Sequence, residues 1–547
     1  MDNVFYDIDS QLSLYTDPRH AQSLKYFRNS LVPVSRLPNI LLTHIFTLLL
    51  NDSQHIYHQH TSPTCLHVSH VCRTWRDAAL HCSLLWTNIL FRPPEWTAIM
   101  LERSRTAPLT IEVLILPRDF ANTAFLNSVR LALSHIRHIR YLCIILLDRC
   151  HDLGDLLSFF PSESPSALEE LTLSSHSDFP IYTFPSFESA SQLRSLDLNR
   201  CHINWQMFSS LGNLTSLVLK DIPIISRPSI DNILFILRSM SNLEKLALIH
   251  AIPELPTSIR TLPPTPGITP IKLERLSHLS LAGFVLDCVN VMRHFIMPRC
   301  KQVNLRAESR WRLPEVTLAI SPLANIISSI FSEHYKQEIP YLGSINWTPG
   351  NAISIIARPA STASCPVIDV DEPFLDLSLS WCYSRHQGIL ETSPGFGTLL
   401  LSLPLGRIVE FSVSLSAREE YIEIAEWLKV IICLSRVETV ILSGGCTYGF
   451  VIALHTAHVS NLPSSNGPSA QELFSTLTGS LTRRRQLGWS IPSIRLVSCY
   501  ITPPRLAVLN TLASGPVECI GEPETWGVGE LDSGSSDEDT FGGDDED

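Results

Sequence analysis

The sequence lacks the short motifs that mark common catalytic sites. It has no Gly-x-Ser-x-Gly elbow, no Gly-x4-Gly-Lys-Ser/Thr loop and no Gly-x-Gly-x-x-Gly after a predicted strand. Gly444 and Gly445 follow a predicted strand, but no further glycine stands at a useful spacing, which indicates a turn. Ser, His and Asp occur throughout without an arrangement that selects a triad. We therefore expect a protein that is not an enzyme.

Long apolar runs are also missing. No run reaches the roughly 18 to 20 apolar residues that span a bilayer. The nearest is 40–50, which Thr43, His44 and Thr47 interrupt. The N-terminus begins with an acidic residue and has none of the apolar core of a secretory signal. We expect no membrane contact and a location in the cytoplasm, the nucleus or both.

Positive charge is not in excess, and the cysteines are not paired in sequence. The chain has 41 Lys and Arg against 53 Asp and Glu, but 11 of the acidic residues fall in 521–547, which holds no Lys or Arg. The remainder is close to neutral, so we expect no nucleic-acid partner. The acidic segment 521–547 is expected to be a disordered tail. None of the 14 cysteines forms a Cys-x-x-Cys pair, which favours reduced, buried thiols.

The stretch from Val34 to Trp86 carries the most specific pattern. Pro38 stands at a helix start, where its missing N–H costs little, and Leu41 and Ile45 recur behind it at helical spacing. A histidine-rich loop follows, and then a second predicted helix over 66–80. Two short amphipathic helices must pack on each other to be stable. The predicted apolar stripe of the second helix comprises Val68, Val71, Cys72, Trp75 and Ala79.

This ordered combination resembles the F-box, a helical module that docks on the Skp-type adaptor of cullin–RING ubiquitin ligases. Leu37-Pro38 with Leu41-Leu42 and Ile45-Phe46 is similar to the family's opening, and Val68-Ser69-x-Val71-Cys72-Arg73-x-Trp75-Arg76 is similar to its second helix. Leu84-Leu85-Trp86 resembles its exit segment, whereas Ile40 stands where the family commonly has an acidic residue. The resemblance implies that the adaptor-binding residues, some of them shared with the module's own core, are Leu37, Pro38, Leu41, Ile45, Phe46, Val71, Cys72 and Trp75. The alternative is that 37–80 is ordinary helical core, which apolar stripes more often are.

After this module the pattern changes to alternating strands and helices. We predict a strand over 86–91, a helix over 96–105 and a strand over 109–115. A Leu-x-x-Leu-x-Leu hexad then recurs six times, with central leucines 29, 25, 21, 29 and 33 residues apart. Each such unit buries its leucines only by stacking on its neighbours, which is typical of leucine-rich repeats. The hexads begin at Ile139, Leu168, Leu193, Leu214, Leu243 and Leu276.

The fold class predicted from these signals is α/β, with a small helical F-box module followed by an irregular leucine-rich-repeat-like strand and helix solenoid. Asn199 stands where such repeats often bond an Asn to the turn backbone, and helices are expected over 229–240 and 289–297. Beyond residue 300 we predict strands at 302–305, 374–379, 408–413, 437–442 and 494–497, and a helix at 421–434. The predicted domains are a poorly defined leader at 1–33, the module at 34–86, the solenoid at 87–515 with loops near 252–270, 356–373 and 460–469, and the tail.

A metal site was considered in the histidine-rich segment. Its candidate ligands are His55, His58, His60, His67, His70, Cys65 and Cys72, but neither cysteine has a close thiol partner. We expect no metal and no cofactor. The resemblance as a whole, which extends to fungal-type F-box proteins, implies a substrate-recognition subunit that joins a Skp-type adaptor and cullin ligase core to an unknown target protein. The alternatives are an interaction scaffold unrelated to ubiquitin transfer and an enzyme with an unrecognised site.

Overall fold

The computed structural model describes two units of the chain, Met1–Ile339 with Pro373–Ser384, and Pro340–Glu372 with Arg385–Asp547. Each unit is described by itself. The described residues are 2–14, 17–51, 64–147, 165–176, 190–256, 261–263, 269–309, 313–336, 342–348, 352–359, 374–380, 396–403, 408, 410–414, 439–443, 493–497 and 517–520. No helix in these ranges is long and apolar enough to cross a membrane.

The first unit begins with two helices, α1 (Asp2–Leu14) and α2 (Pro18–Leu31), in the segment where the sequence showed no period. Asp17 caps α2 by accepting from the backbone N–H of Arg19 at 3.0 Å. Arg28 on α2 donates to both carboxylate oxygens of Asp9 on α1, at 2.6 and 3.1 Å. The short 3-10 helix η1 (Pro33–Arg36) then leads into the helical module.

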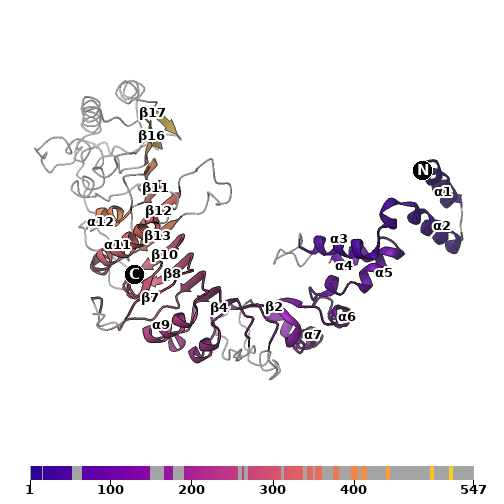
Figure 1. The fold of residues 1–547 in the computed structure, drawn as a ribbon, viewed down its shortest axis with the longest axis horizontal. Coiled ribbons are helices and arrows are strands. Elements are labelled where there is room, and N and C mark those ends of the chain that lie inside the picture. Colours follow the sequence, from indigo (N-terminus) through magenta and orange to yellow (C-terminus); the bar gives the residue numbers. More distant parts are fainter. Residues whose placement is uncertain are drawn as a thin grey trace, which may run out of the picture. The chain divides into compact units, whose positions relative to one another are not determined.

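The helical module consists of α3 (Asn39–Asn51), α4 (Thr64–Ser69), α5 (Arg73–His81) and the 3-10 turn η2 (Ser83–Trp86) (Figure 1). The prediction of one helix over 66–80 is wrong, because the chain breaks between α4 and α5. Cys72 adopts an extended conformation, with φ −157° and ψ 175°, and forms the N-cap of α5. The break turns Val71 outward, although Val68 on α4 is buried.

The chain then passes through α6 (Glu95–Ser104) to β1 (Leu109–Ile115). These two elements confirm the predicted helix and strand. The strand predicted over 86–91 is wrong: Trp86 lies in η2, and only Asn88 pairs, in an isolated bridge to Thr110. Trp86 leaves the strand pattern because its side chain is fully buried against the helices. The next elements are η3 (Pro117–Ala121), α7 (Thr123–Leu133) and η4 (Ile136–His138).

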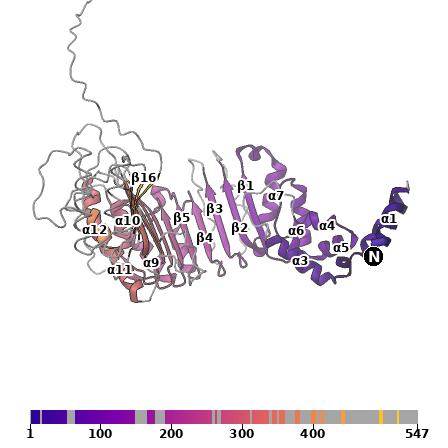
Figure 2. The same ribbon diagram turned by 90° about the horizontal axis from the view of Figure 1, so that it is seen from above.

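A parallel sheet forms the body of the first unit (Figure 2). Each of the six hexads coincides with a strand, as predicted. The second leucines of the hexads align in one buried row across the strands. Leu171 pairs with Leu142 on one side and with Leu196 on the other, and the row extends in the same register to Leu279. Burying each such side chain contributes about 1.5–3 kcal/mol. After β1 the strands, in sheet order, are β2 (Ile139–Leu146), β3 (Glu170–Ser175), β4 (Ser195–Asn199), β5 (Ser216–Lys220), β6 (Lys245–Ile249), β8 (His278–Phe284), β10 (Gln302–Glu308) and β13 (Leu375–Ser380).

Helices cover this sheet. α9 (Ile230–Ser239) matches the helix predicted over 229–240, and α10 (Val285–Met292) packs on β8 and β10 with α11 (Leu313–Lys336) against it. The helix predicted over 289–297 is misplaced, because α10 starts directly after β8, and residues 295–296 join a small second sheet. The remaining elements are η5 (Trp205–Ser210), η6 (Ile224–Ser226), β7 (Ile271–Lys272) and β9 (Phe295–Ile296).

The second unit contains a hairpin and a run of parallel strands. β11 (Leu342–Thr348) and β12 (Ala352–Pro359) pair antiparallel, so the loop predicted from residue 356 is wrong as far as residue 359. β14 (Glu410–Ser414), β15 (Thr439–Ser443), β16 (Ser493–Val497) and β17 (Val517–Ile520) follow in parallel order, with β14 beside β11. α12 (Phe396–Leu401) is a short helix. The predicted helix 421–434, the loop 460–469 and the tail 521–547 lie outside the described residues.

Candidate functional site

The helical module has a narrow core. Leu42 and Phe46, one turn apart on α3, are fully buried. The Phe46 ring lies 5.1 Å from that of Trp75 on α5, centroid to centroid, at an interplanar angle of 56°, a separation at which aromatic pairs attract. Arg76 ties α5 to α4 by donating from Nε to the backbone oxygen of Ser69 at 3.0 Å. Among the described residues, the Phe46–Trp75 contact, the Arg76–Ser69 hydrogen bond and a few apolar neighbours hold the helices together.

Other apolar side chains, on α3 and in the turn before α5, are exposed at the surface. Ile40 is 76% exposed and Leu41 47%, and Val71, in the turn before α5, is 55% exposed. Leu48 and Leu49 near the end of α3 are exposed as well. We call Ile40, Leu41, Leu48, Leu49 and Val71 the outward apolar set. Large apolar side chains in this number on one small module are typical of an interaction surface.

The structure sorts the eight residues predicted to bind an adaptor. Pro38, Leu41 and Val71 are exposed and Phe46 belongs to the core. The half-buried residues are Leu37, Ile45, Cys72 and Trp75. Ile40, Leu48 and Leu49 were not predicted. The sequence did contain an indication of them: residues 40–50 are apolar on nearly every side, and a helix that is apolar on all sides is normally buried on all sides.

Buried contacts join the module to the sheet. Trp86 donates from Nε1 to the backbone oxygen of Ala79 at 2.9 Å, and the Arg103 guanidinium of α6 lies 4.3 Å from the centre of the Trp86 ring system. The backbone N–H of Thr110 on β1 donates to the oxygen of Thr87 at 3.0 Å. The segment that leaves the module is thus fixed to the first strand of the sheet.

A second set of contacts fixes the chain beyond that strand. The Asp119 carboxylate is buried, pairs with Arg92 and accepts from the backbone N–H of Leu116 at 2.9 Å. The Arg92 guanidinium also lies 4.5 Å from the ring centre of Phe125 on α7. Removing Arg92 would leave the buried Asp119 carboxylate without its ion-pair partner.

One face of the sheet places polar side chains between the buried leucines. Strand register aligns Asp197 of β4 with Thr172 of β3, and Lys220 of β5 donates to Asp197 at 3.0 Å. On β1, burial raises the pKa of the Glu112 carboxyl above its usual value. Asn199 donates to the Ser174 hydroxyl of β3 at 3.0 Å, so this contact goes to a neighbouring strand rather than to a turn backbone.

Charge is unevenly distributed over this polar face. Strands β1 to β4 present Glu112, Glu170 and Asp197, whereas β5 and β6 present Lys220 and Lys245. Further along, Arg306 on β10 lies 3.8 Å from the Asp376 carboxylate on β13. An extended polar face whose acidic and basic groups differ from strand to strand can discriminate between charged partners.

The buried thiols are unreactive. Burial raises the pKa of Cys65 and of Cys143 to about 11, and that of Cys201 and Cys300 to about 12, so these thiols stay protonated at neutral pH. In the part of the chain that the structure describes, no group of three His, Cys, Asp or Glu side chains could hold a metal ion. His55, His58 and His60 lie outside the described residues.

Comparison with known proteins finds one family. Residues 34–92 match the family described as F-box-like. No curated protein matches the chain significantly. F-box domains typically bind Skp-type adaptors, so the match supports an F-box protein and suggests, at a general level, an adaptor-binding substrate receptor. The region that follows the F-box-like domain is mixed α/β with a large sheet.

Proposed function

We propose that this protein is the substrate-recognition subunit of a Skp–cullin–F-box-type ubiquitin ligase. In this role the helical module binds a Skp-type adaptor, which connects the chain to the cullin core, and the sheet region binds a target protein. The chain itself contributes no catalytic residue, and ubiquitin transfer belongs to the ligase. The proposed location is the cytoplasm, the nucleus or both.

The observation that carries this proposal is the outward apolar set within the segment that matches the F-box-like family. Leu41 and Leu42 are neighbours on α3, yet Leu42 is fully buried and Leu41 is 47% exposed. The Leu42 side chain is buried by the module itself, whereas the Leu41 side chain becomes fully buried only when a partner covers it. Interface cores are built from apolar side chains of this kind, which lose their contact with water on binding.

The sheet region supports the second half of the proposal. Its parallel strands follow chain order from β1 to β6, and their leucines stack in continuous rows. We propose that this region is a divergent leucine-rich-repeat-like solenoid of the kind found in fungal-type F-box proteins. Its polar face, with Asp197 and Lys220 near the centre, would contact the target protein.

The test is binding of the full chain to a purified Skp-type adaptor by calorimetry. We expect Leu41→Asp to abolish measurable binding, because it places a charge in the apolar contact. Leu131→Asp is the matched control, since Leu131 is 41% exposed on α7, outside the module. Circular dichroism of each variant checks folding.

The outcomes separate this role from the alternative of an interaction scaffold in which the module only caps the sheet. Binding by wild type and Leu131→Asp, with loss in a folded Leu41→Asp, supports the adaptor role. Absence of binding by folded wild-type protein contradicts it and favours the scaffold. Unfolding of the sheet by Leu41→Asp would also favour the scaffold.

A further inference from the structure

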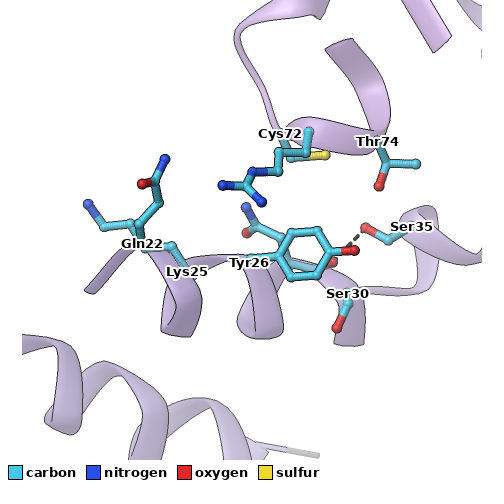
Figure 3. Close-up of a pocket in the computed structure, with 9 residues that line it drawn as sticks. Gln22, Lys25, Tyr26, Ser30, Ser35, Cys72 and Thr74 are labelled. Carbon is cyan, nitrogen blue, oxygen red and sulfur yellow. Dashed lines mark hydrogen bonds between the residues drawn. The ribbon is translucent and has the colours of Figure 1, made fainter. Parts of the chain in front are cut away.

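A small pocket lies between α2 and the start of α5 (Figure 3). Two cationic side chains line it, Lys25 from α2 and Arg73 from α5, and the Arg73 guanidinium carbon is 5.5 Å from the centre of the Tyr26 ring. Ser35 in its wall donates from its hydroxyl to the backbone oxygen of Asn29 at 2.5 Å. The remaining lining residues are Gln22, Ser30, Cys72 and Thr74. None of the described residues that line the pocket is acidic.

The charged side chains around the pocket favour an anionic ligand. The helix α2 carries Arg19, Lys25 and Arg28 and no acidic residue. The carboxylate of Asp9 is engaged by Arg28, and neither residue lines the pocket. The hydroxyl and amide groups of the lining can donate hydrogen bonds to a bound carboxylate or phosphate oxygen. The pocket is therefore a cationic site with hydrogen-bond donors of its own.

The pocket adjoins the outward apolar set. Cys72 forms part of its wall, and its chain neighbour Val71 is 55% exposed. On α2 the aromatic side chains of Tyr26 and Phe27 are each 52% exposed. A partner protein that covers Val71 would thus come within reach of Lys25 and Arg73. An apolar centre with a charged rim is the usual anatomy of a protein interface.

We propose that this pocket receives a carboxylate side chain of the adaptor and that α2 extends the adaptor-binding surface beyond the F-box-like domain. The proposal rests on the proposed function, since it names a further contact of the same partner. The matched segment begins at residue 34, so Lys25 and Tyr26 lie outside it. Lys25 and Arg73 supply the charge, and Tyr26 holds the Arg73 guanidinium over its ring.

The experiment measures the affinity of the full chain for a purified Skp-type adaptor at about 50 mM and about 300 mM salt. The test variant is the double charge reversal Lys25→Glu with Arg73→Glu. We expect it to weaken binding by about tenfold or more at the lower salt concentration, and by less at the higher one, where exposed charges are screened. The neutral variant Lys25→Gln with Arg73→Gln should have an affinity for the adaptor between those of the wild type and the double charge reversal.

The matched control is Lys272→Glu, an exposed reversal on β7 that should leave the affinity unchanged. Wild-type binding that the double reversal leaves intact overturns the pocket assignment while the adaptor role stands. Lack of binding by the wild type overturns both. Direct titration with inorganic phosphate separates the two sources of anion: tight phosphate binding that the reversal abolishes, without a change in adaptor affinity, overturns the carboxylate assignment in favour of a free-phosphate site.

Discussion

The helical module and the sheet of the first unit differ in how completely they bury their leucines. On α3, Leu42 is buried while its neighbour Leu41 is exposed, so the module uses only part of its apolar surface for its own core. On β4 to β6 the two hexad leucines of each strand are buried and aligned with those of the next strand. The hexad leucines of the sheet are thus buried within it, whereas part of the apolar surface of α3 is left uncovered. An incomplete apolar surface on an otherwise folded module is what a docking partner requires.

Two helices of the sheet region begin with a side-chain cap that α5 of the module lacks. Asn122 caps α7 and Ser229 caps α9 by accepting from a backbone N–H in the first turn, at 3.0 and 3.1 Å. Cys72 at the start of α5 provides no side-chain cap. The start of α5 therefore depends more heavily on tertiary contacts than the starts of α7 and α9 do.

The largest effect should follow from removing the aromatic contact in the module. Phe46→Ala is expected to lower the module's free energy of unfolding by about 3–5 kcal/mol, because it leaves a cavity next to Trp75. Hydrogen exchange followed by mass spectrometry would show faster exchange throughout α3 and α5, with β4 to β6 unchanged. Phe27→Ala, which truncates a phenylalanine that is 52% exposed, is the control and should change little. Equal loss of protection in the module and the sheet would contradict the separation of the two cores.

The sequence predicted the sheet better than the module, and the reason is physical. Each hexad carries its own strand signal, because alternate leucines such as Leu196 and Leu198 are buried by neighbours that repeat the same pattern. The break at Cys72 and the inward turn of Trp86 depend on tertiary packing, which a periodic pattern does not encode. The β11–β12 hairpin departs from the repeat and was missed for the same reason.

The candidate site was predictable in outline only. The motif identified Leu41 and Val71, which are exposed, together with Phe46, which is not. Spacing alone does not separate these, since the two sides of α3 are both apolar. Lys25 and Tyr26 were beyond prediction, because the pocket brings α2 next to residues 72–74, about fifty positions away in the chain.

A smaller loss of stability is expected from a change at the junction between the module and the sheet, where Asp119 is buried. Asp119→Ala removes a buried carboxylate that pairs with Arg92 and accepts from Leu116, and we expect a loss of about 2 kcal/mol in the free energy of unfolding. The estimate is below that for a fully buried pair, since the Arg92 side chain is 41% exposed. Chemical denaturation would measure it.

The control for the junction is Asp9→Ala, which breaks an ion pair between two exposed side chains, Asp9 and Arg28. Exposed pairs contribute little, so the change should be much smaller than that for Asp119→Ala. Equal losses for Asp119→Ala and Asp9→Ala would show that the junction is not anchored by its buried charge.

The difference in helix caps can be tested by one substitution made at three sites. Asn122→Ala and Ser229→Ala should each cost about 1 kcal/mol, because each deletes a side-chain acceptor for a first-turn N–H. Cys72→Ala deletes no such bond and should cost less. Thermal unfolding of the three variants gives the ranking. Cys72→Ala could instead lower thermal stability more than Ser229→Ala does. In that case the packing of Cys72 would stabilise α5 more than the Ser229 cap stabilises α9.

The smallest effect at neutral pH is expected for His294, a histidine buried at the end of α10. Burial lowers the pKa of His294 below its usual 6.5, even though its Nδ1 lies 2.7 Å from the backbone oxygen of Asn290. The unfolded chain therefore binds the proton more tightly than the folded chain does. The stability that depends on neutral His294 is present above pH 6.5 and is lost as the pH falls through that value.

Replacing this histidine should remove that pH dependence. His294→Leu is expected to reduce the slope of the unfolding free energy against pH between about pH 7.5 and 5.5, because no proton is then taken up at this position on unfolding. His67→Gln, at an exposed position on α4 of the module, is the control and should leave the profile as it is in the wild type. If the profile of His294→Leu matched that of the wild type, the acid sensitivity would have to arise elsewhere. A weaker dependence would instead assign that part of it to His294 in the sheet region, and not to the exposed histidines of the module.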